Sequence, residues 1–262
     1  MKLGVVDALG FAFDRIEELS GGGVRIGAAV STRELAADAR IRERYPVVSQ
    51  AALLSGAPGR VPTAAATANS LLERAPAVTG HGRELAILGA SGASVAAHRS
   101  DLAVAFAALD AVVRTAGPDG ERVIPITELH RLPDREHGGD TVLRHGERIT
   151  AVDLPPLTIA VNSRYGLVRE GASSQPVVVS VAAALEVTDG VVRDVRVALG
   201  GVAPRPWRAA KVADALRGVP ATTASFRRAA ESELAPARPL LDNGLKVAIA
   251  CNLIVRTLAL LR

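Results

Sequence analysis

The sequence contains a single cysteine, Cys251, among its 262 residues. One thiol excludes internal disulfide bonds and any iron–sulfur cluster held by several thiolates of this chain. The five histidines include no pair at a spacing typical of zinc sites, and one cysteine cannot complete such a site. We therefore expect neither a metal ion nor an iron–sulfur cluster on this chain.

Aromatic residues are scarce, and long hydrophobic runs are missing. Aromatics make up 3% of the chain, and the arginines behind its net charge of +4 are scattered, so nothing suggests a surface for nucleic acid. No apolar run approaches the roughly 20 residues of a membrane-spanning helix. The N-terminus also lacks the basic and then apolar pattern of a signal peptide. We expect a cytoplasmic protein that binds neither nucleic acid nor membrane.

The composition itself is that of a folded protein. Hydrophobic residues make up 48% and charged residues 22% of the chain, a balance typical of globular and not of disordered proteins. The length is sufficient for two modest domains or one large domain.

The first part of the chain combines strand and helix patterns. The segment from Val24 to Ala28 alternates in the manner of a strand. Ser31 and Glu34 have the spacing of a capping box, so we expect a helix from this point towards Arg44. Pro46 is favourable at the first turn of a second helix, which we predict over residues 46–54.

The middle of the chain predicts one helix and several short strands. Ser100 and Asp101 are favourable N-cap residues for a helix that runs through Leu109. Residues 117–120 form a Gly-Pro-Asp-Gly turn between two strand candidates. The strands are expected at residues 85–90, 93–97, 111–115, 122–126 and 149–154.

Pro155 and Pro156 mark the best domain boundary. Beyond them, two β-rich runs meet at an Asp189-Gly190 turn, which is a strong hairpin signal. The predicted elements are strands at 176–186 and 191–199, followed by helices at about 208–217, 221–234 and 244–261. We predict an α+β fold in three parts, residues 1–56, 57–156 and 157–262.

The most informative motif runs from Arg60 to Arg74 and reads RVPTAAATANSLLER. It resembles the second flavin-binding loop of the FAD-carrying medium subunits of molybdenum hydroxylases, the xanthine dehydrogenase and carbon monoxide dehydrogenase family. That loop reads roughly R-N-x-A-T-[IV]-G-G-N-[LI]. Residues 98–103, 180–185 and 198–208 resemble later segments of the same family in the expected order. The sequence is identified as a degenerate member of this family.

The resemblance implies a fold and a set of partners. Two α/β lobes of the PCMH or vanillyl-alcohol-oxidase type would clasp FAD, followed by an α+β domain like the C-terminal domain of CO dehydrogenase flavoproteins. Residues 1–56 would be the remnant of the first lobe and 57–156 the second lobe. Family members pass electrons between iron–sulfur clusters on a partner subunit and an acceptor, and molybdenum chemistry takes place on a further subunit. Whether the chain forms a homo-oligomer stays open.

Three departures from the family pattern concern the flavin. Ala68 and Asn69 replace two glycines, which let a backbone reach positive φ and approach a pyrophosphate. We expect Asn69 to keep a left-handed turn, because asparagine tolerates that conformation. Leu167 replaces a lysine that lies near the flavin ring in the family and that can stabilise negative charge there. The family's first flavin loop, of the A-G-G type, is missing, for which a mis-set start is one explanation.

The departures predict FAD binding that is weakened or lost. The ordinary alternatives are a plain surface turn for the loop and an N-cap for Ser100 and Asp101. If FAD does bind, the residues that we place at the cofactor are Thr67, Ala68, Asn69, Ser70, Ser100, Asp101 and Ile149.

Several functions remain open, and the sequence does not decide whether the chain is an enzyme. The first is a flavoprotein-subunit homologue with eroded FAD motifs that binds a small ligand in the former flavin cleft. The second is a flavin-independent enzyme of secondary metabolism, such as a cyclase, isomerase or lyase, and the third is an intact FAD subunit whose first loop was lost through a mis-set start. A non-catalytic assembly protein is a further alternative. Candidate acids and bases for the cleft are Asp101, Tyr165, His81 and His98.

Overall fold

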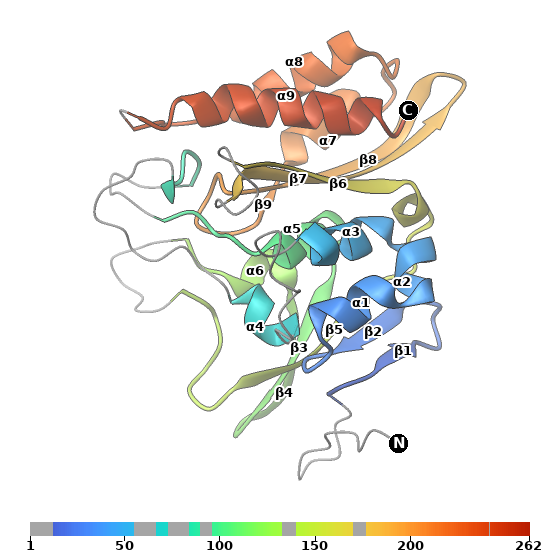
Figure 1. The fold of residues 1–262 in the computed structure, drawn as a ribbon, viewed down its shortest axis with the longest axis vertical. Helices are drawn as coiled ribbons and strands as arrows, with labels where there is room; N and C mark the ends of the chain where they lie inside the picture. The colour runs from blue at the N-terminus through green and yellow to red at the C-terminus, as the bar shows by residue number, and fades with distance from the viewer. Residues whose placement is uncertain are drawn as a thin grey trace.

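The computed structural model describes residues 13–54, 67–72, 84–89, 96–132, 140–169, 177–240 and 242–262. These residues form four layers, with helices above a four-stranded sheet, and a second group of helices between that sheet and a five-stranded sheet (Figure 1). The α+β fold expected from the sequence is confirmed. In the part of the chain that the structure describes, no helix is both long and apolar enough to cross a membrane.

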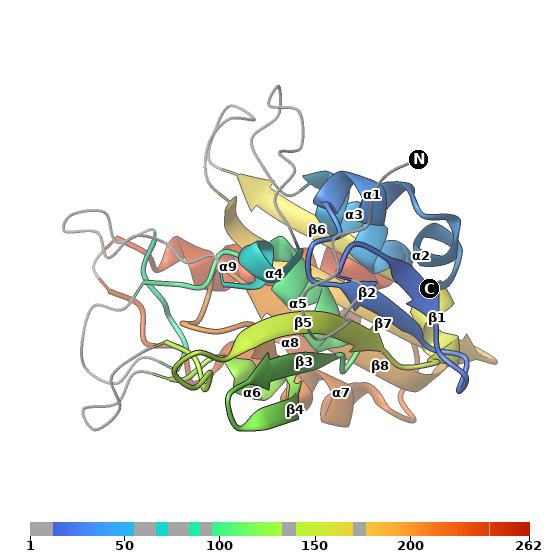
Figure 2. The ribbon, with the colours of Figure 1, turned by 90° about the horizontal axis from the view of Figure 1, so that it is seen from below.

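The five-stranded sheet is antiparallel and has the order β1-β2-β5-β3-β4. Figure 2, which views the molecule from below, shows this sheet in front of the helices. Along β2, Val24 and Ile26 are fully buried on the helix side, and the intervening Arg25 points to the outer face. The strands are β1 (Ile16–Glu18), β2 (Val24–Gly27), β3 (Val112–Gly117), β4 (Gly120–Pro125) and β5 (Arg148–Leu154).

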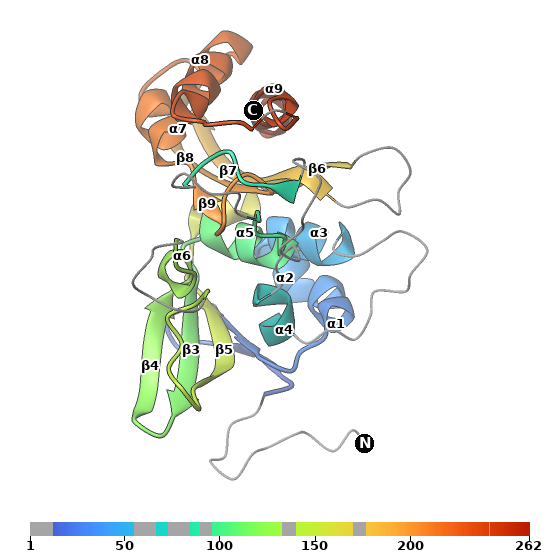
Figure 3. The ribbon, with the colours of Figure 1, turned by 90° about the vertical axis from the view of Figure 1, so that its left-hand side faces the viewer.

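Six helices of the described residues fill the layer between the sheets. The α5 helix is buried at every position and contacts both β7 and β8, so it lies at the centre of the molecule (Figure 3). The helices are α1 (Thr32–Ala37), α2 (Ala39–Arg44), α3 (Pro46–Leu54), α4 (Thr67–Leu71), α5 (Asp101–Ala108) and α6 (Ile126–Leu129).

The capping box at Ser31 and Glu34 is confirmed, because each side chain accepts a hydrogen bond from the other residue's backbone N–H. The single helix predicted from there to Arg44 is wrong. Asp38 has an extended backbone between α1 and α2, and its carboxylate accepts the N–H groups of Arg40 and Ile41. Aspartate competes for backbone donors in this way, so it ends one helix and caps the next.

The four-stranded sheet has the order β6-β7-β8-β9 and carries the C-terminal helices on its upper face. The predicted hairpin is confirmed, since Asp189 (φ 52°) and Gly190 (φ 73°) both adopt the left-handed conformation of a two-residue turn. The elements are the 3₁₀ helix η2 (Thr158–Val161), β6 (Ser163–Arg169), β7 (Val177–Thr188), β8 (Val191–Gly200), β9 (Trp207–Arg208), α7 (Ala210–Leu216), α8 (Thr223–Leu234) and α9 (Leu245–Ala259).

The apolar core is divided by this sheet. Val181 and Ala183 on β7 pack among the C-terminal helices, and the intervening Ala182 packs on the opposite side against the core around α5. The continuous apolar run of β7 follows from burial on both faces.

The strands predicted at 85–90 and 93–97 are wrong over the residues that the structure describes there. Leu85 and Ala96 form one isolated bridge, and no strand is assigned to residues 84–89 or 96–97. The N–H groups of Ile87 and Leu88 instead donate to the carbonyl of Val202. Apolar residues here are buried against the C-terminal part of the chain, which accounts for their hydrophobicity without a strand.

Candidate flavin site

The loop that resembles a flavin-binding motif enters the described structure at α4. Both the N–H and the hydroxyl of Thr67 donate to the carbonyl of Val30, each at 2.9 Å. The N–H of Ala68 donates to the carbonyl of Ala28 at 3.1 Å. These bonds fix the start of α4 to the segment that follows β2, and they use the first two N–H groups of α4.

The expected left-handed conformation of Asn69 is wrong. Asn69 lies inside α4, and the only non-glycine residues with positive φ in the described segments are Asp110 and Asp189. The Asn69 side chain is exposed, whereas Thr67 and Ser70 are buried.

In the described part of this loop, two backbone N–H groups are already used by protein carbonyls. A pyrophosphate cradle of the glycine type needs successive backbone N–H groups that point at the anion. The N–H groups of Thr67 and Ala68 point instead at protein carbonyls. Ser70 is 6% exposed, which leaves Asn69 as the accessible polar side chain among Thr67–Ser70.

Asp101 and Tyr165 meet in the interior of the protein. The hydroxyl of Tyr165, on β6, donates to the carboxylate of Asp101 in the first turn of α5. Tyr165 and Asp101 are 4% and 5% exposed, so neither presents its polar atoms to a wide opening. Burial, followed by the charge of Asp101, raises the pKa of Tyr165 well above its ordinary value. The phenol therefore stays protonated and serves as a donor.

Ser100 acts as the N-cap that the sequence predicts for α5. Its hydroxyl accepts the N–H of Ala103 at 3.0 Å. This contact satisfies one of the free N–H groups at the start of the helix.

His98 lies in a buried pair with His130, a partner that the sequence did not indicate. The two Nε2 atoms are 3.0 Å apart, and the rings are arranged edge to face. Both Nε2 atoms also lie near the carbonyl of Leu71, at the end of α4. The N–H of Ser100 points at Nδ1 of His98, so neutral His98 carries its proton on Nε2. The pair connects α4 to the segments before α5 and after α6.

The remaining predicted residues are distributed more widely. Ile149 is a core residue of β5, 7% exposed, and His81 lies outside the described residues. Leu167 is half-buried and packs against the core below β6, on the same side as Tyr165. The guanidinium of Arg169 also reaches that side, where it donates to the carbonyl of Leu54 at 2.7 Å. The structure thus brings α4, His98, Asp101 and Tyr165 around the start of α5.

Comparisons with known proteins show to which family this chain belongs. Residues 6–157 match the family described as the FAD binding domain in molybdopterin dehydrogenase, and residues 173–259 match the CO dehydrogenase flavoprotein C-terminal domain. The chain is 37% identical to the aldehyde oxidoreductase FAD-binding subunit PaoB of Escherichia coli, over 97% of this chain and 83% of PaoB. The chain belongs to the FAD-binding subunits of molybdenum hydroxylases.

Several solved structures share the fold of this chain. Quinoline 2-oxidoreductase from Pseudomonas putida matches with a TM-score of 0.71 at 19% identity. Carbon monoxide dehydrogenase from Oligotropha carboxidovorans matches with 0.73 at 17%, and the enzyme from Hydrogenophaga pseudoflava with 0.73 at 21%. In each case the match covers 94% of this chain and 77% of the solved chain.

Proposed function

We propose that this chain is the flavin subunit of a molybdenum-hydroxylase-type complex in which the FAD site is weakened. The observation that carries the proposal is the use of the Thr67 and Ala68 N–H groups by the carbonyls of Val30 and Ala28. An N–H that already donates to a protein carbonyl gives little additional stabilisation to a phosphate. We then expect the cleft between the lobes to bind a smaller ligand that has no pyrophosphate group.

The proposal includes the partners and location expected from the sequence. PaoB is named as a subunit of an aldehyde oxidoreductase, and the match over 97% of this chain supports a similar place beside iron–sulfur and molybdenum subunits. We place the complex in the cytoplasm. The proposal also treats residues 1–56, 57–156 and 157–262 as first-lobe remnant, second lobe and C-terminal domain.

An FAD titration of the wild-type chain and of the double variant Ala68→Gly/Asn69→Gly tests the proposal. The two glycines restore the family pattern and allow the backbone to turn its N–H groups towards a phosphate. One recovered hydrogen bond to a charged group corresponds to about tenfold tighter binding. Binding is measured by isothermal titration calorimetry and by the flavin absorbance that the protein retains after gel filtration.

The matched control is Ala39→Gly at the first position of α2, an exposed alanine at a helix start away from the loop. This control has the loss of helix propensity that an alanine-to-glycine change causes, at most about 1 kcal/mol of stability, and it leaves the motif unchanged. The proposal is wrong if the double variant binds FAD no more tightly than the wild type and the control.

A further inference from the structure

A pocket of about 420 Å³ lies on the outer face of the five-stranded sheet, away from α4 and from the start of α5. Its apolar wall includes Leu19, Val112, Pro155 and Pro156. The volume is in the range of small-molecule sites, which combine apolar walls with a few polar groups.

Two arginines and one aspartate form the polar side of this pocket. Arg25, Asp153 and Arg114 come from β2, β5 and β3, and strand alternation directs all three to the outer face. Asp153 accepts Nε and Nη2 of Arg25 at 2.7 and 2.9 Å, and Nε of Arg114 at 2.6 Å. Burial opposes ionisation of Asp153, but the two arginines outweigh it and lower the pKa, so the carboxylate is charged.

One carboxylate therefore faces two guanidinium groups. Nη1 of Arg25 and both Nη atoms of Arg114 have no hydrogen-bond partner among the described residues. The two arginine side chains are 33% and 35% exposed, whereas the Asp153 side chain is 8% exposed. The unused donors are consequently on the solvent side of the ion pair, where a ligand can reach them.

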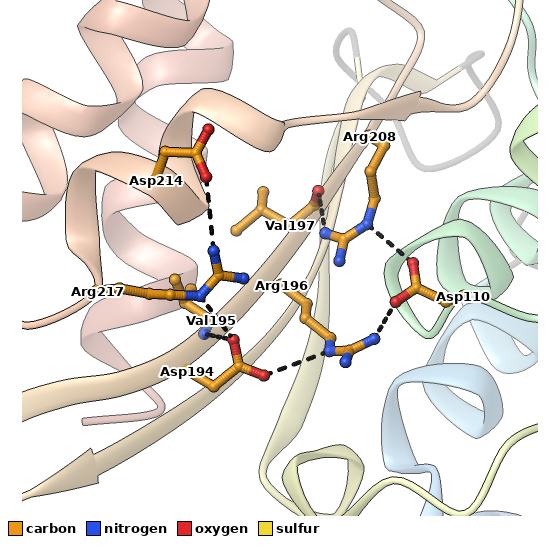
Figure 4. Close-up of polar contacts among 8 residues, drawn as sticks. All are labelled: Asp110, Asp194, Val195, Arg196, Val197, Arg208, Asp214 and Arg217. Carbon is orange, nitrogen blue, oxygen red and sulfur yellow. Dashed lines mark hydrogen bonds and ion pairs between the residues drawn. The ribbon is translucent and has the colours of Figure 1, made fainter.

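The other acid in the pocket wall is already neutralised. Asp110 accepts hydrogen bonds from Arg196 and Arg208, which come from the four-stranded sheet (Figure 4). Glu17, opposite Arg25 in the β1–β2 register, and Glu121 on β4 also act on Arg25, but both are exposed to water, which screens their charge. The pocket thus offers a net positive end and an apolar body.

We propose that this pocket binds a small organic monoanion with an apolar body, such as an aromatic carboxylate. The carboxylate accepts the Nη donors of Arg114 and Arg25, in the bidentate geometry that guanidinium groups favour. The body of the ligand lies against Val112, Pro155 and Pro156. This site is separate from α4 and does not depend on the proposed flavin function.

Calorimetric titration with naphthoate, and with naphthamide as its uncharged analogue, tests the assignment. We expect naphthoate to bind and naphthamide to bind at least tenfold more weakly, because only the anion pairs with the guanidinium groups. Added sodium chloride should weaken naphthoate binding, since the arginines are partly exposed. Equal affinity for the two compounds, or no binding of naphthoate, overturns the proposal.

Three variants locate the site. Arg114→Gln removes one cation, leaves the bidentate contact between Arg25 and Asp153 in place, and should weaken naphthoate binding about tenfold or more. Arg122→Gln on the neighbouring strand β4 is the matched control, because Arg122 does not line this pocket, and it should bind as the wild type does. Val112→Phe fills the pocket without a change of charge, so this variant should not bind naphthoate. Equal effects of Arg114→Gln and Arg122→Gln contradict the assignment.

Discussion

Lys246 provides a prediction that depends mainly on burial. Its side chain on α9 is 1% exposed, and Nζ donates to the carbonyls of Leu85 and Gly201, each at 2.7 Å. Neither partner is a carboxylate. Burial lowers the pKa of Lys246 from 10.5 to about 8.

The lowered pKa makes the stability of the fold depend on pH in a defined direction. Below the folded-state pKa of about 8, both states bind the proton, and the folded state carries the full cost of a buried ammonium. Between about 8 and 10.5 the unfolded chain binds more protons, so stability rises with pH. From about pH 7 to about pH 9.5 the gain is at most about 2 kcal/mol, because the two carbonyls favour the ammonium and reduce the shift.

Urea denaturation of the wild type and of Lys246→Met at several pH values measures this gain. Other titrating groups are common to both proteins, so their difference in unfolding free energy isolates Lys246. As pH rises, the unfolding free energy of the wild type should increase relative to that of Lys246→Met. Lys211→Met, which removes an exposed lysine from α7, should retain the wild-type pH dependence. A difference between wild type and Lys246→Met that does not change with pH, or that moves in the opposite direction, refutes the argument.

Two further substitutions test buried and bridging contacts. Tyr165→Phe removes the donor to the buried Asp101 carboxylate and should lower the unfolding free energy by about 1–3 kcal/mol in urea denaturation; an unchanged midpoint would contradict the contact. Asp110→Asn keeps a residue that tolerates the left-handed backbone but loses the charge that pairs with Arg196 and Arg208. We expect a loss of at most about 1 kcal/mol that shrinks in high salt, and a loss independent of salt would argue against ion pairing.

Local signals in the sequence predicted much of the fold. The Asp189-Gly190 turn identified the β7–β8 hairpin, because both positions require positive φ. The capping box at Ser31 and the N-cap at Ser100 identified the starts of α1 and α5. These features depend on neighbours within a few residues, and such neighbours are visible in the sequence.

Features that depend on distant contacts were not predictable in this way. The conformation of Ala68 and Asn69 follows from hydrogen bonds between α4 and the segment at Ala28–Val30, far away in sequence. The pairing of His98 with His130 also joins distant segments, and neither histidine has a local pattern that indicates it. For the same reason, the Arg25–Asp153–Arg114 cluster becomes apparent only when three strands are aligned.

The flavin content of the purified chain tests the central claim most directly. The protein is produced in cells with ample flavin, dialysed extensively, and assayed by absorbance for FAD bound per chain. A flavin subunit whose pyrophosphate contacts are weakened should retain far less than one FAD per chain and lose the remainder on dialysis. Stoichiometric FAD that persists through dialysis would contradict this account.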